Sequence, residues 1–322
     1  MLVLESDRVD QGLYEALGYL TREGSRQTSR AGTVYSFDTP VTIIHRNPLN
    51  MVSTCDVRDA NPFFHYFEAM WMLAGKKDAR WLDKFVSNFS ERFAEKDGAQ
   101  HGAYGWRWRQ HFGMDQLNKV VELLKKNPQN RRAVIQMWDA DVDLGFNVKD
   151  VPCNLVVVPR IRNKELDITV YNRSNDIIWG ACGSNAVHFA YLQYWMAAQL
   201  GLDVGTYYQV ANNMHAYEDV MGRLYMRHGG SWPILDSHAQ PVVTFTGAPT
   251  LGHIGELVDN FASMSSGEYQ PTDGTPGIFF REFKHMAMLH SIHKGDPQVH
   301  IPDHGPWIEA AKAWMKRRGT WT

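Results

Sequence analysis

The stretch Val151-Pro152-Cys153-Asn154 leads into apolar, mostly β-branched residues at positions 155–158. Such a run predicts a β-strand that is buried on both faces. The polar residues at 162–164 predict a turn, and residues 166–171 predict the returning strand. We therefore expect a β-hairpin at the centre of the chain, with the other elements arranged around it.

One cysteine, Cys153, stands at the start of this predicted hairpin, and Arg173 follows its second strand. A guanidinium close to the thiol would lower the thiol pKa and favour the nucleophilic thiolate. The alternative is that Cys153 is a small buried hydrophobic residue, as most single cysteines are. The spacing alone leaves both interpretations open.

The length allows one large domain or two small ones, and the absence of internal repeats, low-complexity tracts and linkers favours one soluble globular domain over residues 1–322. The chain has 44% hydrophobic and 21% charged residues, and its net charge is −2. This balance offers no basic surface for nucleic acid and no polybasic membrane anchor. The three cysteines form no disulfide or zinc pattern, and the acidic N-terminus is unlike a signal peptide. We expect a cytoplasmic protein without a nucleic-acid or membrane partner.

Arginines mark two candidate anion sites. Arg30 lies in a loop with serine, threonine and glycine, a composition that can wrap a phosphate or simply form a solvated loop. Arg131 and Arg132 precede the strand predicted at 133–138. They form either an anion clamp or a charged rim, and the sequence does not distinguish these two interpretations.

Helix patterns place further polar residues in apolar surroundings. Asn61-Pro62 starts a helix whose body is almost wholly apolar except for Glu68, which must face a cavity or form an ion pair. Residues 80–93 predict a second helix. Three histidines at 285, 290 and 293 lie on a predicted helix, but no carboxylate or cysteine pattern supports them, so we expect no metal site.

Polar segments after the hairpin complete the set of candidates. Residues 172–176 form a dense polar cluster, and the tight loop 180–185 opens onto an apolar helix. Asn185 stands near the N-terminus of that helix, where an asparagine can be a simple cap. Residues 212–217 end a predicted strand with polar and aromatic side chains, a favoured place for a site.

Taken in order, these segments resemble the thymidylate synthase family, including its pyrimidine-nucleotide hydroxymethylase branch. The resemblance extends from about Arg30 to Tyr217. It rests on residues 30–33, Glu68 to Trp71, Tyr104-Gly105 with Trp108-Arg109, Arg131-Arg132, Pro152-Cys153, Arg173-Ser174 with Asp176, Gly180 to Asn185, and His215 to Tyr217. No single segment is specific, but eight segments in the same order are.

The resemblance implies an α/β fold of the thymidylate synthase type, with a large mixed β-sheet flanked by helices and sheets stacked in a homodimer. It also implies that the Cys153 thiolate adds to C6 of a pyrimidine nucleotide, and that 5,10-methylenetetrahydrofolate then supplies a one-carbon unit to C5. The implied catalytic residues are Cys153, Glu68, Asp176 and Tyr104, with Glu68 relaying protons near C4 and Asp176 and Gly180 contacting the folate.

The same resemblance assigns the nucleotide-binding residues. Arg30, Arg173 and Ser174 hold the phosphate, together with Arg131 and Arg132 from a partner subunit. His215 and Tyr217 bind the sugar 3′-hydroxyl. Asn185 reads the base, and its amide matches uracil in one orientation and cytosine in the other.

Several departures from the synthases point to water as the final reactant. Asn154 replaces a histidine, Asn212-Asn213 replaces Gly-Asp, and residues 88–93 lack the tryptophan that covers the folate. The 180–185 loop is one residue longer, and the C-terminus differs from the synthase tail. A wetter site would favour a hydroxymethyl product over hydride transfer.

We therefore expect a phage-like enzyme that converts dUMP to 5-hydroxymethyl-dUMP. The alternatives are a dCMP hydroxymethylase, a thymidylate synthase that makes dTMP, and a non-catalytic nucleotide- or RNA-binding relative. Retention of Cys153, Glu68 and Asp176 argues against the last of these, because binding alone requires none of them.

Overall fold

A six-stranded mixed β-sheet forms the base of the protein. The computed structural model describes residues 1–145, 147–235, 247–269, 277–301 and 304–322. The strand order is β1-β4-β9-β7-β6-β5. The strands are β1 (Leu2–Ser6), β4 (Val41–His45), β9 (Asp203–Ala211), β7 (Glu165–Asn172), β6 (Asn154–Arg162) and β5 (Ile135–Gln136). The β1–β4 and β7–β9 pairs are parallel and the others antiparallel, so the expected mixed α/β architecture is observed.

The predicted central hairpin is the β6–β7 pair. Its two-residue turn places Asn163 and Lys164 at φ values of 49° and 66°, the left-handed region that tight hairpin turns require. A register shift between Asn154 and Val156 interrupts the pairing immediately after Cys153. This irregularity lets the chain change direction at the candidate nucleophile.

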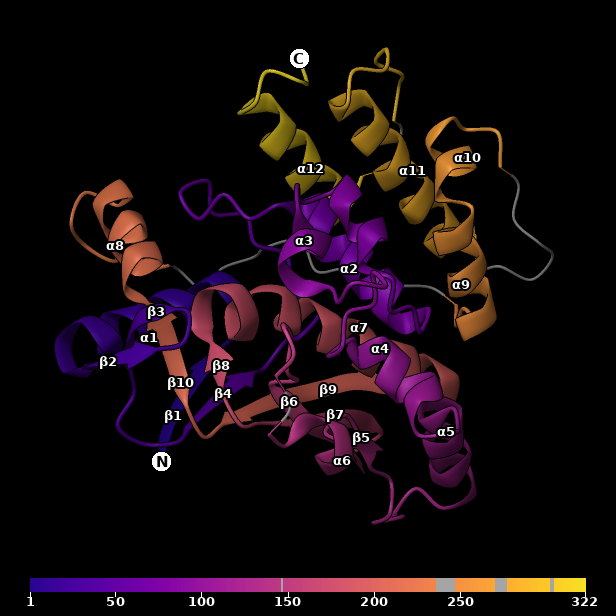
Figure 1. Cartoon of the computed structure of the whole chain (residues 1–322). Coiled ribbons are helices and arrows are strands. Elements are labelled where there is room, and N and C mark those ends of the chain that lie inside the picture. The colour runs from indigo at the N-terminus through magenta and orange to yellow at the C-terminus, as the bar shows by residue number, and fades with distance from the viewer. Residues whose placement is uncertain (146, 236–246, 270–276, 302–303) are drawn as a thin grey trace.

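The prediction that the first hairpin strand is buried on both faces is wrong for the single chain. In β6, Val157 is fully buried, whereas Leu155 and Val158 are only partly covered. Tyr171 of β7 is 43% exposed. Helices pack against one face of the sheet, so alternate side chains on the other face remain partly open to solvent (Figure 1).

A smaller four-stranded sheet lies beside the first. Its order is β2-β3-β10-β8, with β2 (Ser25–Ser29), β3 (Gly32–Ser36), β10 (Met214–Tyr217) and β8 (Asn175–Asp176). The parallel β8–β10 pair brings Asp176 opposite His215, although 39 positions separate them in the sequence. The small sheet thus joins three of the sequence segments that carry candidate site residues.

Two apolar helices cover the large sheet. Helix α7 (Asn185–Leu200) packs on β7 and β9, and α2 (Pro62–Leu73) packs on α7. Helix α2 begins as predicted: Pro62 occupies its first turn, and the Asn61 side chain accepts a hydrogen bond from the Phe64 backbone at 3.1 Å. Glu68 and Asn185 are therefore held on adjacent buried helices.

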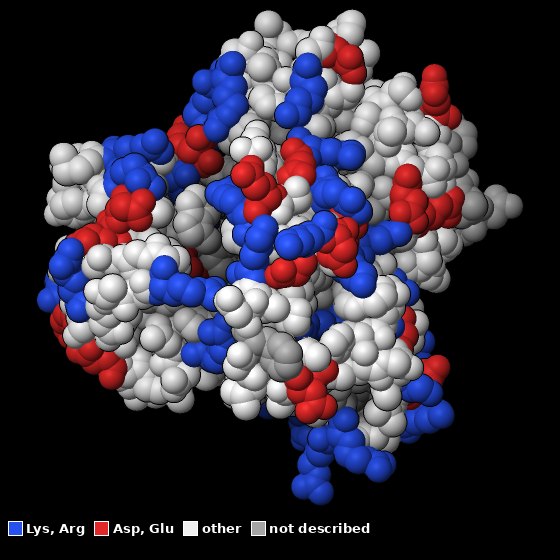
Figure 2. Space-filling view, viewed as in Figure 1, with Lys and Arg blue, Asp and Glu red and all other residues white. Residues whose placement is uncertain are grey.

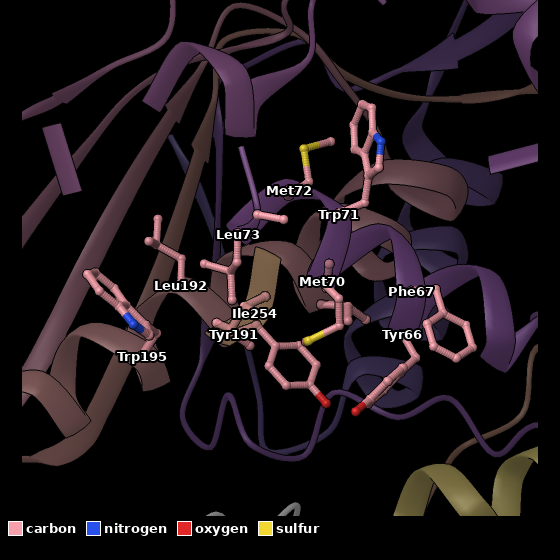
Figure 3. Close-up of a cluster of buried hydrophobic side chains, with 14 of the residues drawn as sticks. Tyr66, Phe67, Met70, Trp71, Met72, Leu73, Tyr191, Leu192, Trp195 and Ile254 are labelled. Carbon is pink, nitrogen blue, oxygen red and sulfur yellow. The ribbon is translucent and has the colours of Figure 1, made fainter. Parts of the chain in front are cut away.

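A third layer of helices closes the core above α2. It comprises α9 (Leu251–Asp259), α10 (Phe261–Ser265), α11 (Gly277–His293) and α12 (Pro306–Lys316), which lie at the top and right of Figure 1. Both α9 and α12 contact α2. Figure 3 shows Tyr66 and Met70 of α2 beside Tyr191 of α7 in this core. The buried apolar surface makes α2 and α7 a rigid support for the side chains at their ends.

The predicted helix over residues 80–93 is wrong as a single element. The structure has a 3₁₀ helix, η1 (Ala79–Lys84), followed by a short helix, α3 (Phe89–Phe93). Between them Asn88 adopts φ 59°, a left-handed conformation that an α-helix does not tolerate. Asparagine enters this region more readily than most residues, which explains the break.

The remaining elements connect these layers. They are α1 (Val9–Glu23), α4 (Tyr104–Trp106), η2 (Arg107–His111), α5 (Gln116–Lys126), α6 (Ala140–Asp143), η3 (Ile177–Ser184) and α8 (Glu218–Arg227). Within the described ranges, no helix has the length and apolar character needed to span a bilayer. Acidic and basic side chains are interspersed on the face shown in Figure 2.

Candidate active site

Tyr104 holds the backbone around the candidate nucleophile. The Cys153 amide donates a hydrogen bond to the Tyr104 hydroxyl at 3.2 Å, and the Asn154 amide lies 3.5 Å from the same oxygen. The next residue, Gly105, allows α4 to approach α2, because a Cβ there would lie 1.9 Å from the Met72 carbonyl oxygen. The close helix contact thus places Tyr104 against the start of β6.

Arg173 holds the same segment from another side. Its Nε donates to the Pro152 carbonyl at 2.8 Å and its Nη2 donates to the Val151 carbonyl at 3.0 Å. Its backbone amide donates to the Cys153 carbonyl at 3.0 Å. The arginine that the sequence placed one hairpin away from Cys153 therefore lies next to it and fixes its backbone.

The pKa of the Cys153 thiol is raised, contrary to the prediction that Arg173 makes it acidic. Burial is the largest cause, and the negative charges of Asp150 and Asp176 raise the pKa further. Arg173 and Arg30 lower it, but in the unliganded protein they do not outweigh burial. Activation of the thiol therefore needs a further contribution, such as a base or a bound substrate.

Glu68 has a buried partner that the sequence did not reveal. Its Oε2 lies 2.9 Å from His188 Nε2, and both side chains are almost fully buried. His188 stands three positions after Asn185 on α7, so the two share a helix face. That spacing is the sequence signal that could have identified His188. The structure supports the interpretation of Glu68 as a carboxylate inside the protein rather than on its surface.

The small sheet gathers the residues predicted to hold the sugar and folate. Ser174 Oγ lies 3.5 Å from His215 Nδ1, which is 3.1 Å from Asn213 Oδ1. Asp176 Oδ1 accepts a hydrogen bond from the Trp179 amide at 2.6 Å. Burial raises the pKa of Asp176 to about 6, although this amide contact lowers it in part.

Arg30 and Tyr217 belong to the same electrostatic neighbourhood. Arg30 lies in the turn between β2 and β3, where Gly32 has φ 124° and Ser29 Oγ donates to the Gly32 carbonyl at 2.6 Å. Burial raises the pKa of Tyr217, and so do the charges of Asp176 and Cys153, whereas Arg30 lowers it. The charges of Arg30, Asp176 and Cys153 therefore all act on the Tyr217 hydroxyl.

Arg131 and Arg132 are not part of this cluster within one chain. Both are exposed, in the loop that precedes β5. Across the described ranges, neither guanidinium forms an ion pair. The Arg132 backbone amide donates a hydrogen bond to Asn130 Oδ1 at 2.9 Å. Their predicted role in a neighbouring subunit remains a prediction.

Three residues beside these candidates, Asp150, Arg58 and Trp179, were not singled out by the sequence, whereas Asn154 was, as a departure from the synthases. The Asp150 carboxylate accepts a hydrogen bond from Gln100 Nε2 at 2.8 Å, and burial raises its pKa. Arg58 is buried and donates to the carbonyls of Ile178 and Cys182. Trp179 is 57% exposed beside Asp176. Asn154 is fully buried, and its side-chain atoms Oδ1 and Nδ2 have no hydrogen-bond partner among the described residues.

Distance along the chain explains why some of these were missed. Arg58 lies 120 positions before Ile178, in an irregular segment without a recognisable pattern. Asp150 stands only three positions before Cys153, so its proximity in sequence was an available signal. For Trp179, the contact with Asp176 depends on the fold of η3.

Comparisons with known proteins identify the family. The Thymidylate synthase family profile matches residues 14–229. The chain is 46% identical over 259 residues to a deoxyuridylate hydroxymethyltransferase of Pseudomonas phage M6, covering 80% of this chain and 71% of that protein. It is 32% identical over 233 residues to the protein of that name from Bacillus phage SP01, covering 69% and 60%. A thymidylate synthase of Corynebacterium aurimucosum is 29% identical over 160 residues, which is 47% of this chain. This chain belongs to the thymidylate synthase family.

Proposed function

We propose that this protein is a deoxyuridylate hydroxymethyltransferase, which converts dUMP to 5-hydroxymethyl-dUMP with methylenetetrahydrofolate as co-substrate. Membership of the family indicates a one-carbon transferase. The similarity to phage proteins of that name supports uracil as the base and hydroxymethyl as the product. The catalytic unit in this proposal is the single chain segment 1–322, acting in the host cytoplasm as a phage enzyme.

The observation that best supports water as the final reactant is the environment of Asn154. Its fully buried amide follows Cys153 directly, and neither of its polar atoms has a partner among described residues. A buried amide in a polar site is normally satisfied by protein groups or by ordered water. Because Asn154 is 0% exposed, it has no room for a water molecule in the unliganded protein; in this proposal its side-chain amide binds one when substrate binding opens the space beside Cys153.

Cys153 begins and ends the proposed reaction. Its thiolate forms a bond to C6 of the uracil, and the electron pair of the C5–C6 bond makes C5 nucleophilic. C5 forms a bond to the methylene carbon of methylenetetrahydrofolate, and loss of the C5 proton then expels tetrahydrofolate and leaves an exocyclic methylene on the ring. Water then adds to the exocyclic methylene and gives up a proton, while the bond between C6 and Cys153 breaks. The ring double bond is restored and the thiolate is released.

Buried polar residues would move the protons. The Glu68–His188 pair lies inside the protein between α2 and α7, where a carboxylate and an imidazole can exchange a proton with the C4 oxygen through water. The Tyr104 hydroxyl accepts from the Cys153 amide and retains its own proton for donation.

The nucleotide would lie between the small sheet and the start of β6. Arg30, Arg173 and Ser174 would bind its phosphate, and His215 and Tyr217 its 3′-hydroxyl. Phosphate binding would compete for the Arg173 guanidinium, which the Val151 and Pro152 carbonyls now occupy in part. Arginine has five donors, so it can bind an anion and retain one of these contacts.

The residues near Asp176 fit a folate. Asp176 Oδ2 is buried and has no partner among described residues, and it can accept from the N–H groups of a pterin ring. The Trp179 backbone amide bonds this carboxylate, and the residue is 57% exposed, so its indole is available to a ligand from the same loop. Gly180 lies on the same loop, so its predicted place near the folate is retained in the proposal.

A homodimer would complete the phosphate site. The partly exposed face of the large sheet, with Tyr171 at 43% and Val134 at 40% exposure, provides apolar surface for a second copy. Stacking two such faces would bury the side chains of β6 that a single chain leaves half-covered. Arg131 and Arg132, exposed before β5, would then be free to reach the partner's nucleotide.

Labelled water tests this proposal directly. In water enriched in oxygen-18, dUMP and methylenetetrahydrofolate should give a hydroxymethyl nucleotide that carries the label. A Cys153→Ala variant is the matched control and should give no product. A methyl product without oxygen would contradict the proposal, and a product formed only from dCMP would overturn the base assignment.

A further inference from the structure

A row of three buried asparagines ends at the residue assigned to the base. Asn185 Nδ2 donates to Asn175 Oδ1 at 3.3 Å, and Asn175 Nδ2 donates to Asn172 Oδ1 at 3.3 Å. Asn172 Nδ2 in turn donates to the backbone carbonyl of Val210 at 3.1 Å. These three side chains are 8%, 2% and 3% exposed, so water does not readily replace any of the links.

The end of the row at Val210 determines the direction of every link. A backbone carbonyl can only accept a hydrogen bond, so the Asn172 atom facing it must be the amide nitrogen. Asn172 Oδ1 then faces Asn175 and requires a donor from it. Asn175 consequently presents its oxygen to Asn185, and Asn185 must present its nitrogen. The orientation of the Asn185 amide is therefore set two residues away from the base.

Backbone contacts and a glycine keep the row in place. The Asn175 amide donates to the Asn213 carbonyl at 2.8 Å, and the Asn212 amide donates to the Asn172 carbonyl at 3.0 Å. A Cβ on Gly180 would lie 2.0 Å from Asn175 Oδ1 and 3.2 Å from Asn185 Nδ2. Only glycine leaves room at position 180 for the link between the two asparagines.

We propose that Asn172 and Asn175 are positioning residues that lock the Asn185 amide in one orientation and thereby make the enzyme selective for uracil over cytosine. This inference rests on the proposed function, which assigns Asn185 to the base. Uracil presents N3–H and O4 and needs the amide oxygen at N3 and the nitrogen at O4. Cytosine presents an unprotonated N3 and an amino group and needs the reverse.

One locked orientation cannot serve both bases. The bond from Cys153 to C6 and the bound phosphate fix the ring, so the base cannot turn to suit a reversed amide. If Asn185 flipped alone, its oxygen would face Asn175 Oδ1, and two acceptors would meet without a hydrogen. The loss of one buried hydrogen bond changes relative affinity about tenfold to hundredfold.

The test compares the ratio of kcat/KM for dUMP to kcat/KM for dCMP. Asn172→Leu removes the group that sets the direction of the row, at a residue that does not touch Asn185. Asn175→Leu removes the middle link, and Gly180→Ala disrupts it sterically. Each should lower the ratio about tenfold or more, in part through a gain in turnover of dCMP. Dissociation constants for dUMP and dCMP, measured by calorimetry, should change in the same sense.

Gln193→Met is the matched control for loss of a buried amide. Gln193 lies on α7, is fully buried and donates to the Leu166 carbonyl at 2.7 Å, outside the asparagine row. This variant should lower the melting temperature and leave the base ratio within about twofold of wild type, since it removes a buried hydrogen bond elsewhere.

Three variants keep the inference open to refutation if one of them fails to fold. A folded variant that loses turnover of both nucleotides equally, with an unchanged ratio, would overturn the positioning role. A wild-type enzyme that hydroxymethylates dCMP in preference to dUMP would refute the proposed function instead. In that case the selectivity for uracil would be refuted as well, and variants that shifted the ratio toward dUMP would show only that the row orients Asn185.

Discussion

Arg173 Nε donates a hydrogen bond to the Pro152 carbonyl at 2.8 Å, directly before the candidate nucleophile. The second hydrogen bond, to the Val151 carbonyl, makes this a two-point attachment of a charged group to the backbone. Arg173 therefore both places Cys153 and provides the positive charge that lowers the pKa of its thiol. A phosphate-binding role would add a third task to the same side chain.

Replacing Arg173 should separate the effect of its charge on the Cys153 pKa from the effect of its hydrogen bonds on the position of Cys153. In Arg173→Gln the pKa of the Cys153 thiol should rise further, because a positive charge that lowers it has been removed. Arg173→Lys keeps the positive charge, so the pKa of the Cys153 thiol should stay lower than in Arg173→Gln. A lysine lacks the planar guanidinium that bonds both carbonyls, so kcat/KM should fall about tenfold or more. The measurement is the rate of Cys153 alkylation against pH, followed on its peptide by mass spectrometry.

Arg46→Gln is the control for this comparison, since Arg46 is an exposed arginine paired with Glu5 far from Cys153 in the sheet order. It should leave the alkylation profile unchanged. Equal profiles for Arg173→Gln and wild type would show that Arg173 has no influence on the thiol.

Cys153→Ala should abolish turnover and retain nucleotide binding, because the thiolate forms the covalent bond to C6 while phosphate and sugar contacts come from other residues. Calorimetry with dUMP measures the binding, and product analysis measures the turnover. Cys182→Ala is a matched substitution at a fully buried cysteine and should keep activity. A Cys153→Ala enzyme with even a tenth of wild-type turnover would exclude the nucleophile assignment.

Subunit mixing tests the shared phosphate site. Cys153→Ala and Arg131→Ala chains should each be inactive alone, yet mixtures should regain activity, because heterodimers contain one site with both residues intact. The expected maximum is about a quarter of wild-type activity per chain, since half of the dimers are mixed and each has one good site. Mass spectrometry must confirm exchange, and inactive heterodimers would show that each site is complete within its own chain.

The contribution of Asp176 to the free energy of unfolding should fall as pH rises from about 4 to about 6. Its pKa is about 6 in the folded protein and 3.8 in the reference state, so the folded chain holds a proton that the unfolded chain releases. The contribution is fully present below the lower value and is lost as pH rises through the higher one. Thermal melts of wild type and Asp176→Asn should diverge across this range, with the variant gaining stability relative to wild type.

Asp38→Asn, a substitution at an exposed carboxylate, controls for the other groups that titrate in the same range. Its melting profile should parallel that of wild type. If the Asp176→Asn profile were also parallel, the raised pKa of Asp176 would be wrong.

Local patterns predicted the parts of this fold that depend on neighbouring residues. The hairpin of β6 and β7 and the apolar helices α2 and α7 follow from alternation, β-branching and apolar runs. The break at Asn88 was not predictable, because a single left-handed residue outweighed a helical pattern. Burial on one face of the sheet was also missed, since it depends on which face the helices cover.

In the candidate site, too, local sequence predicted some residues, whereas others depend on tertiary packing. Cys153, Glu68 and Arg173 could be identified as unusual residues in their local surroundings. The contact of Arg58 with the η3 carbonyls and the row from Asn172 to Asn185 depend on tertiary packing. The raised pKa of Cys153 was missed for a related reason, because burial outweighs the charge of Arg173.

The most direct test of the account is the oxidation state of the folate product. With dUMP and methylenetetrahydrofolate, the enzyme should release 5-hydroxymethyl-dUMP and tetrahydrofolate in equal amounts. Dihydrofolate, which absorbs differently in the ultraviolet, should not accumulate, because water and not hydride reacts with the exocyclic methylene. Dihydrofolate formed in equal amount with dTMP would contradict the central claim and make the enzyme a thymidylate synthase in activity.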